Sequence, residues 1–152
     1  MASYMPTLFL RKLNTGGIVV GTDAFKISLN TGTVPSANRD SANQYYGGSD
    51  FGNEASGTGY SAGGNTLTLS EALYTTGGVH HSAVSNSTGS TSWSSATLTS
   101  VTYAALYDNT LSPKAIGAVY DFGGAQSVTA NTFQINFTDT TPNYRVWYLS
   151  TS

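Results

Sequence analysis

The chain has no cysteine, so it can form neither a disulfide nor a thiolate metal site. It also has few ions: 9% of its 152 residues are charged, whereas ordinary soluble domains have about 25%. The net charge is −2 and Lys and Arg do not cluster, which is unlike a nucleic-acid-binding surface. No stretch approaches the roughly 20 apolar residues that span a bilayer. We therefore expect no nucleic-acid partner and no membrane partner.

The first residues do not have the pattern of a secretory signal. Their apolar run, residues 8–10, is short, and the basic pair Arg11–Lys12 follows the run instead of preceding it. We therefore expect synthesis in a cytoplasm, followed by work as a soluble or assembled component.

Hydroxyl side chains take the place of ions in this sequence. Ser and Thr together account for 42 residues. A surface of hydroxyls and tyrosines costs little to desolvate, because few ions have to be stripped of water. Such a surface suits permanent protein contacts or contacts with sugars. The same bias is also common in β-proteins, because Thr favours strands, so composition leaves both interpretations open.

Apolar residues alternate with polar residues through most of the chain, with the period of two that is typical of half-buried strands. No helical stripe exceeds two turns, and the segment 6–13 is the one helical candidate. The pattern predicts a single all-β domain over residues 1–152, an antiparallel β-sandwich that is jelly-roll-like rather than immunoglobulin-like. The expected strands are 17–23, 24–29, 65–74, 79–84, 96–108, 114–122, 127–137 and 144–149.

Three segments do not fit this strand pattern. Residues 1–12 are expected to form a short N-terminal arm or helix, 30–56 a long polar loop, and 85–95 a polar turn region. A loop as long as 30–56 inside a compact domain is usually functional, an interface, or a sign of missed structure. Loop aromatics can stack on sugars, anchor a protein interface, or simply hold the loop against the sheet. The candidate interface residues are Leu8, Phe9, Leu10, Tyr45, Tyr46, Phe51 and Trp93.

The glycine-rich stretch GTGYSAGG, residues 57–64, matches two chemical motifs by letter only. A phosphate-binding loop needs a helix after the glycines, and a strand pattern follows here. The G-x-S-x-G match around Ser61 also needs a strand, a sharp turn and a helix, with an acid and a histidine later in the chain. A chance match is the better interpretation. We expect Gly63 and Gly64 to form a turn with positive φ that leads into a strand.

No other residues form a catalytic or metal-binding pattern. His80 and His81 are adjacent, so on a strand their rings point to opposite faces and do not share one metal ion easily. The eight acids are scattered, and no pair of carboxylates is singled out for glycoside hydrolysis. We therefore expect no enzyme activity, no cofactor and no metal.

Four segments together resemble a group of small virion structural proteins of tailed bacteriophages. They are DAFKISL at 23–29, SGTGYSAGGNTL at 56–67, TYAALYDN at 102–109 and IGAVYDFGGAQSVTANTFQINF at 116–137. The likeness keeps the order of the segments and covers about two-thirds of the chain. The C-terminal TDTTPNYRVWYLSTS departs from it, since such proteins often end in a glycine-containing strand.

The resemblance implies a non-enzymatic part of the virion, assembled in the host bacterial cytoplasm. The composition fits a capsid decoration (cement) protein best, because uncharged contacts to a shell hardly change with salt. The expected partners are the major capsid protein and further copies of the chain, as a symmetric homo-oligomer such as a trimer. The alternative is a tail- or fibre-associated protein, or a carbohydrate-binding module that contacts host glycans.

Overall fold

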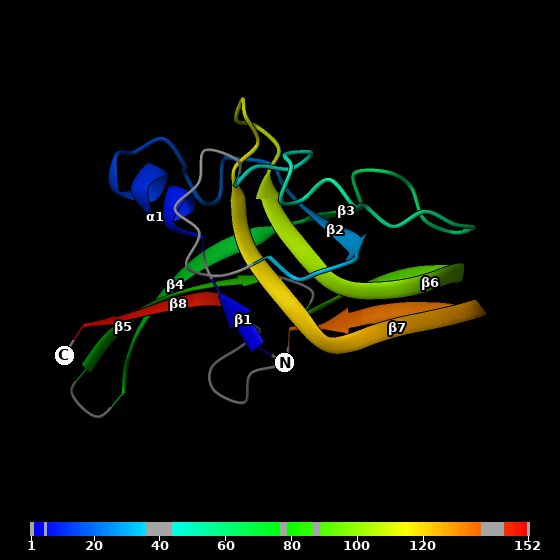
Figure 1. Ribbon diagram of the computed structural model, residues 1–152. Coiled ribbons are helices and arrows are strands. Elements are labelled where there is room, and N and C mark those ends of the chain that lie inside the picture. Colours follow the sequence, from blue (N-terminus) through cyan, green and yellow to red (C-terminus); the bar gives the residue numbers. More distant parts are fainter. Residues whose placement is uncertain are drawn as a thin grey trace.

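The computed structural model describes the backbone of residues 2–4, 6–35, 44–76, 79–86, 89–137 and 145–151. Side chains are described for residues 6, 8, 9, 11–35, 44–70 and 89–137. This part of the chain is antiparallel β-structure with one helix, α1, at Thr7–Asn14 (Figure 1). The predictions of an all-β fold and of a helix at 6–13 are confirmed.

The strands form two sheets. The larger sheet has the order β1-β7-β6-β2-β3 and the smaller has the order β4-β5-β8, with antiparallel pairing in both. A sandwich or jelly-roll arrangement of the two sheets stays a prediction. The strands are β1 Ala2–Tyr4, β2 Phe25–Thr31, β3 Asn65–Leu67, β4 Leu69–Thr76, β5 Val79–Asn86, β6 Ser90–Asp108, β7 Ile116–Asn136 and β8 Arg145–Thr151.

Side chains on both faces of the larger sheet are buried. On one face, Phe25, Ile27 and Leu29 of β2 pack into the main core cluster, as their alternation predicts. On the other face, Tyr103 and Tyr107 of β6 belong to a second cluster. The second cluster explains why the middle of the sheet is apolar on both sides and why β7 begins with a continuous apolar run.

Strands β6 and β7 form one long ribbon that folds over on itself (Figure 1). Pairing runs from Tyr107↔Ile116 beside the turn to Ser90↔Asn136 at the far end, and the register shifts at five places. Ala130 of β7 has a positive φ of 48°. Ser95 and Ser100 of β6 also have positive φ, of 51° and 55°. These irregularities bend the ribbon. Beyond Asp121, β7 pairs only with β6 among the described strands.

The structure corrects three sequence-based expectations about strands and turns. Segments 114–122 and 127–137 are one strand, because Gly123 and Gly124 lie within β7 instead of ending it. Residues 85–86 and 90–95 of the expected turn region are strand, since β5 extends to residue 86 and β6 begins at residue 90. Segment 17–23 is not a strand; it is a loop and turn in which the Val19 N–H donates to Asp23 Oδ2 over 2.7 Å.

Residues 2–4 and 6–12 are part of the fold and do not form a free arm. Strand β1 pairs with β7 in the register Ala2↔Asp121, and the Phe9 side chain of α1 is fully buried against the ring of Phe25. The helix forms where Pro6 precedes it, a residue suited to a helix start. The burial of the Phe9 side chain explains why the helix docks on the sheet.

The long segment 30–56 is held close to β2 in its described part. Asn30 bridges Glu54, the Thr31 N–H donates to the Asn53 carbonyl over 2.8 Å, and the Ala55 N–H donates to the Leu29 carbonyl over 2.8 Å. Residues 53–55 therefore run beside the strand that the segment leaves. Residues 36–43 lie outside the described part of the chain.

Candidate functional site

Three segments that are far apart in the sequence meet at one end of the larger sheet. The Leu8 N–H of α1 donates to Gln44 Oε1 over 3.0 Å, and the Ile116 N–H donates to the Gln44 carbonyl over 3.1 Å. The Tyr46 N–H donates to the carbonyl of Lys114, which lies in the β6–β7 connection, over 2.9 Å. We call the half-buried side chains gathered here, those of Leu8, Tyr45, Tyr46 and Lys114, the helix-end surface.

Three of the seven interface candidates lie in the core instead of on exposed loops. Phe9 is 0%, Phe51 2% and Trp93 4% exposed. Phe51 packs edge-on against Tyr103, at 6.3 Å between ring centroids. Trp93 faces inward because it belongs to the alternating start of β6, where Ser92 and Ser94 take the solvent side. Burial leaves these three rings no surface to offer a partner in this conformation.

Of the other four interface candidates, three are partly exposed and one has a side chain outside the described residues. Leu8, Tyr45 and Tyr46 are half-buried and belong to the helix-end surface. The Leu10 side chain lies outside the described residues. The structure thus brings together candidates from both segments singled out in the sequence, 1–12 and 30–56.

The carboxylate of Glu54 accepts several hydrogen bonds beside the helix-end surface. Its Oε2 accepts the Tyr46 hydroxyl at 2.5 Å, and its Oε1 accepts the Tyr60 hydroxyl at 2.5 Å and the Gly63 N–H at 2.7 Å. The Tyr60 oxygen in turn accepts the Leu29 N–H at 3.0 Å. One carboxylate therefore connects the long segment, the glycine-rich stretch and β2. The sequence analysis did not single out Glu54. The one signal for it was that acidic residues are rare in this chain.

The tyrosines around Glu54 are held as neutral hydrogen-bond donors. Burial, then the hydrogen bond to Glu54, raises the pKa of Tyr46 to about 12. The same two causes raise the pKa of Tyr60 still further. Tyr46 stacks on Tyr107 with centroids 4.3 Å apart, and Lys114 Nζ lies 5.6 Å from the Tyr46 centroid. The cluster fixes the position of Tyr46, because both its ring and its hydroxyl have partners.

The glycine-rich stretch forms the expected turn. Gly63 and Gly64 have φ of 90° and 67°, and β3 begins at Asn65. The Gly64 N–H donates to the Ser61 carbonyl over 3.0 Å, and the Tyr107 hydroxyl donates to the Gly63 carbonyl over 2.7 Å. A strand, not a helix, follows Ser61, so the backbone differs from the nucleophile turn of hydrolases. His80 and His81 lie in β5, and their side chains are outside the described set.

Two carboxyl groups, those of Asp23 and Asp108, lie close together where two loops meet near the end of β6. Asp108 is fully buried, and its Oδ1 accepts the Thr110 N–H at 2.7 Å and the Leu111 N–H at 3.3 Å. Burial, followed by the negative charge of Asp23, raises the pKa of Asp108, although the two N–H groups act in the opposite direction. The loops are also tied by the Asn109 N–H, which donates to the Ala24 carbonyl over 2.7 Å.

The described residues form neither a metal centre nor a membrane-spanning helix. Their side chains include no group of three His, Asp or Glu residues arranged to hold a metal ion. Helix α1, the helix in the described chain, has eight residues and is too short to cross a bilayer.

Comparison with known proteins identifies no relative: no family model, no curated protein and no solved structure matches this chain. The geometry and the sequence therefore carry the functional argument.

Proposed function

We propose that the chain is a non-enzymatic structural protein of a tailed-bacteriophage virion, which decorates the shell of the major capsid protein as a symmetric oligomer such as a trimer. The observation that carries this proposal is the helix-end surface. It brings Leu8 of α1 beside the distant segment that holds Tyr45 and Tyr46, because the Leu8 N–H donates to the side-chain oxygen of Gln44. The resemblance of the four ordered segments to phage virion proteins supports the same role.

The helix-end surface has the physical properties of an anchor. Leu8, Tyr45 and Tyr46 are apolar or aromatic and half-buried, and they are fixed by a helix, a bridge between Tyr45 and Ala115, and the stack of Tyr46 on Tyr107. Rigid aromatic side chains lose little entropy when they bind, and such anchors dominate many interfaces. A symmetric oligomer would engage several capsid subunits together, so that weak single contacts give durable attachment.

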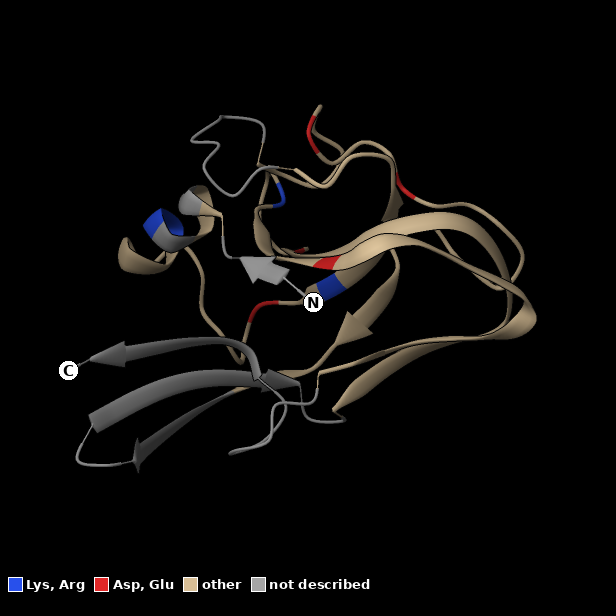
Figure 2. Cartoon of the chain, turned by 60° about the horizontal axis from the view of Figure 1, so that its bottom comes forward, with Lys and Arg blue, Asp and Glu red and all other residues tan. Residues whose placement is uncertain are grey.

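The scarcity of charge fits permanent attachment. Residues 90–107 of β6 and 122–136 of β7 contain no Lys, Arg, Asp or Glu, and the outer ribbon is uniformly tan in Figure 2. On the helix-end surface itself, Leu8, Tyr45 and Tyr46 carry no charge, and contacts made without ions are not screened by salt. We therefore expect binding to the shell that hardly changes between about 0.05 M and about 0.5 M salt.

The direct test is co-sedimentation of the purified protein with shells of the major capsid protein of its virion. Leu8→Ser and Tyr45→Ser each remove apolar contact area, and we expect each to weaken binding about tenfold. Thr129→Ala, on the exposed outer part of β7, is the matched control and should bind as the native chain does. Circular dichroism confirms that the variants remain folded. Full binding by the double variant Leu8→Ser/Tyr45→Ser would refute the role of this surface.

Copy number per particle tests the location. A shell role predicts copies on the order of hundreds, in keeping with a repeated lattice. Three, six or twelve copies would indicate the tail or the portal vertex and would favour the alternative of a tail- or fibre-associated protein. Contact with host glycans is the other alternative, and the pocket described next bears on it.

A further inference from the structure

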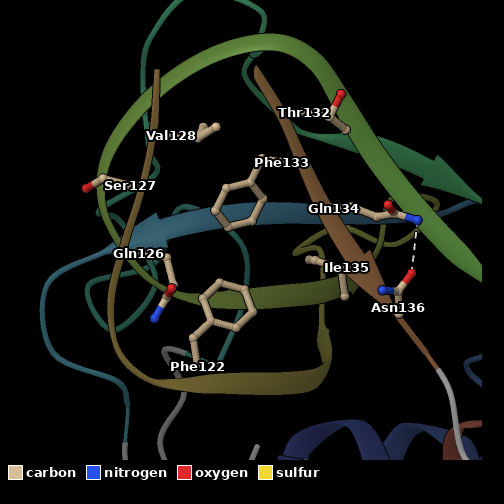
Figure 3. A pocket seen from close by; sticks show the side chains of 9 residues that line it. All are labelled: Phe122, Gln126, Ser127, Val128, Thr132, Phe133, Gln134, Ile135 and Asn136. Carbon is tan, nitrogen blue, oxygen red and sulfur yellow. Dashed lines mark hydrogen bonds between the residues drawn. The ribbon is translucent and has the colours of Figure 1, made fainter. Parts of the chain in front are cut away.

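A pocket of about 490 Å³ opens between the two arms of the folded-over strand β7 (Figure 3). All the residues that line it belong to residues 122–136 of that strand. Figure 3 shows the rings of Phe122 and Phe133 together in the interior of the curve, with the amide side chains of Gln126 and Gln134 at its sides. The bend at Ala130, where φ is positive, brings the two arms to face each other.

The apolar part of the pocket is held in place by the core. Phe133 packs edge-on against buried Trp93, with centroids 6.2 Å apart. Phe122 lies 5.9 Å from Phe133, and both rings are half-exposed. The two rings thus form a preformed aromatic wall that needs no rearrangement before it contacts a ligand.

The polar part consists of amides that are already oriented. Gln134 Nε2 donates to Asn136 Oδ1 over 2.9 Å, and Gln126 Nε2 donates to the Gly124 carbonyl over 3.2 Å. Each of these bonds takes one donor of an amide that has two donors and an acceptor. The exposed hydroxyl of Thr132 is also among the lining groups.

We infer that this pocket binds a neutral carbohydrate unit. A sugar ring has an apolar C–H face, which packs on an aromatic ring, and a rim of hydroxyls that both donate and accept hydrogen bonds. Phe122 and Phe133 supply the first contact, and the amides supply the second because they too both donate and accept. The volume lies within the range of small-ligand pockets.

The absence of charge selects against other ligands. None of the residues that line the pocket is charged, so a phosphate, a carboxylate or a cation would lose hydration there without gaining a partner of opposite charge. The site is also separate from the helix-end surface, because α1 lies at the opposite end of the molecule from the bend of the ribbon (Figures 1 and 2). Sugar binding therefore goes beyond the proposed attachment to a shell and does not depend on it.

The test is an NMR titration of the ¹⁵N-labelled full chain, in which side-chain amides give separate signals. The probes are the methyl glycosides of glucose, galactose and N-acetylglucosamine, and a neutral-glycan array with bacterial surface polysaccharides follows. The first arm detects free sugars and the second detects sugars on a cell surface. We expect saturable shifts of the amides of Gln126, Gln134 and Asn136 with at least one probe.

Phe122→Leu keeps the bulk but loses the flat ring, and Gln126→Ala loses an amide. We expect each to reduce affinity about three- to tenfold. Thr129→Ala lies on the same strand outside the pocket, and Tyr45→Ser lies on the helix-end surface, so both should bind as the native chain does.

The inference is overturned if no probe in either arm binds, or if Phe122→Leu and Gln126→Ala both bind like the native chain. It is also overturned if the amide signals shift with protein concentration alone, which would show that a second copy fills the pocket. The shell-binding assay with Leu8→Ser is unaffected by any of these results, so the two proposals fail separately.

Discussion

The ring of Phe9 lies directly over Gly117. A Cβ atom built on Gly117 would come within 3.0 Å of Phe9 Cε2 and 3.1 Å of Cζ. Helix α1 and strand β7 therefore meet at a point that leaves no room for a side chain. This contact, together with the pairing of β1, makes the N-terminal residues part of the folded domain.

Gly117→Ala should destabilise the protein by about 1–3 kcal/mol, because the added methyl group forces the buried Phe9 ring to move. The position does not have a positive φ, so backbone strain does not contribute. Urea unfolding gives the free energy of unfolding. Gly17→Ala is the control: its Cβ would meet nothing closer than 3.5 Å, and its effect should stay within about 0.5 kcal/mol. Equal values for the two variants would contradict the docked helix.

Substitutions at Gly63 and Gly64, in the turn before β3, distinguish the cost of backbone strain from the cost of a steric clash. Both have positive φ, but a Cβ on Gly64 would overlap the Ile27 carbonyl oxygen, whereas one on Gly63 would lie 3.4 Å from the Tyr107 hydroxyl. Gly63→Ala should therefore cost about 1–2 kcal/mol from strain alone. Gly64→Ala should cost about 3 kcal/mol or more, since backbone must move. Thermal unfolding of both variants measures the difference, and a Gly64→Ala protein as stable as Gly63→Ala would show that this close approach is absent.

Asp108→Asn should stabilise the protein at neutral pH. Burial and the nearby Asp23 raise the pKa of Asp108, so the folded state favours its neutral form. Its contribution to stability is complete below the unfolded pKa of about 3.9 and is lost as the pH rises through the higher folded pKa. Asparagine stays neutral and keeps the Oδ1 acceptor for the Thr110 and Leu111 N–H groups.

We expect a gain of about 1 kcal/mol at pH 7, and a smaller gain in acid. Unfolding free energies measured across this pH range give the profile. The control is Asn109→Ala, which lies next to Asp108 and removes no ionisable group, so its effect on stability should be the same in acid and at neutral pH. If Asp108→Asn raises the free energy of unfolding equally in acid and at neutral pH, the pKa of Asp108 is not raised by burial.

The buried tyrosines should make the protein sensitive to strong alkali. Burial raises the pKa of Tyr103 to about 12, and burial with the Glu54 hydrogen bond raises that of Tyr46 to about 12. Phenols of the unfolded chain titrate near 10. Because the folded pKa is the higher one, this contribution to stability is complete below about pH 10 and is lost between about pH 10 and 12.

Tyrosinate absorbance and urea unfolding, measured in parallel, test this expectation. Part of the ten tyrosines should titrate near pH 10, and the rest should ionise only at higher pH or on unfolding. Titration of all ten near pH 10 in a chain that is still folded would show that Tyr46 and Tyr103 are not protected.

The alternation of apolar and polar residues predicted the secondary structure wherever the local pattern matches the burial of the side chains in the fold. Phe25, Ile27 and Leu29 gave β2, and the apolar stretch after Pro6 gave α1. Strand β1 was missed because three residues carry no pattern, and its pairing with residues 119–121 is non-local. Gly123 and Gly124 suggested the end of a strand, whereas they are accommodated inside a bent one.

The candidate site depended even more on tertiary structure. Glu54, Tyr46 and Tyr60 are close in sequence, but their hydrogen bonds need the turn at Gly63 and the backbone of β2. The pocket in β7 needs a bend that comes from register shifts with β6, and no single-strand pattern encodes such shifts. Trp93 looked exposed because serines surround it, although its place in the alternation pointed inward.

The irregular pairing of β6 with β7 also bears on aggregation. A long, uncharged strand with one unpaired side is a template for edge-to-edge association with other chains, and few ions are present here to oppose it. The register shifts and the bend at Ala130 break the straight, flat edge that such stacking requires. The same bulges that shape the ribbon thus oppose the stacking of copies into fibrils.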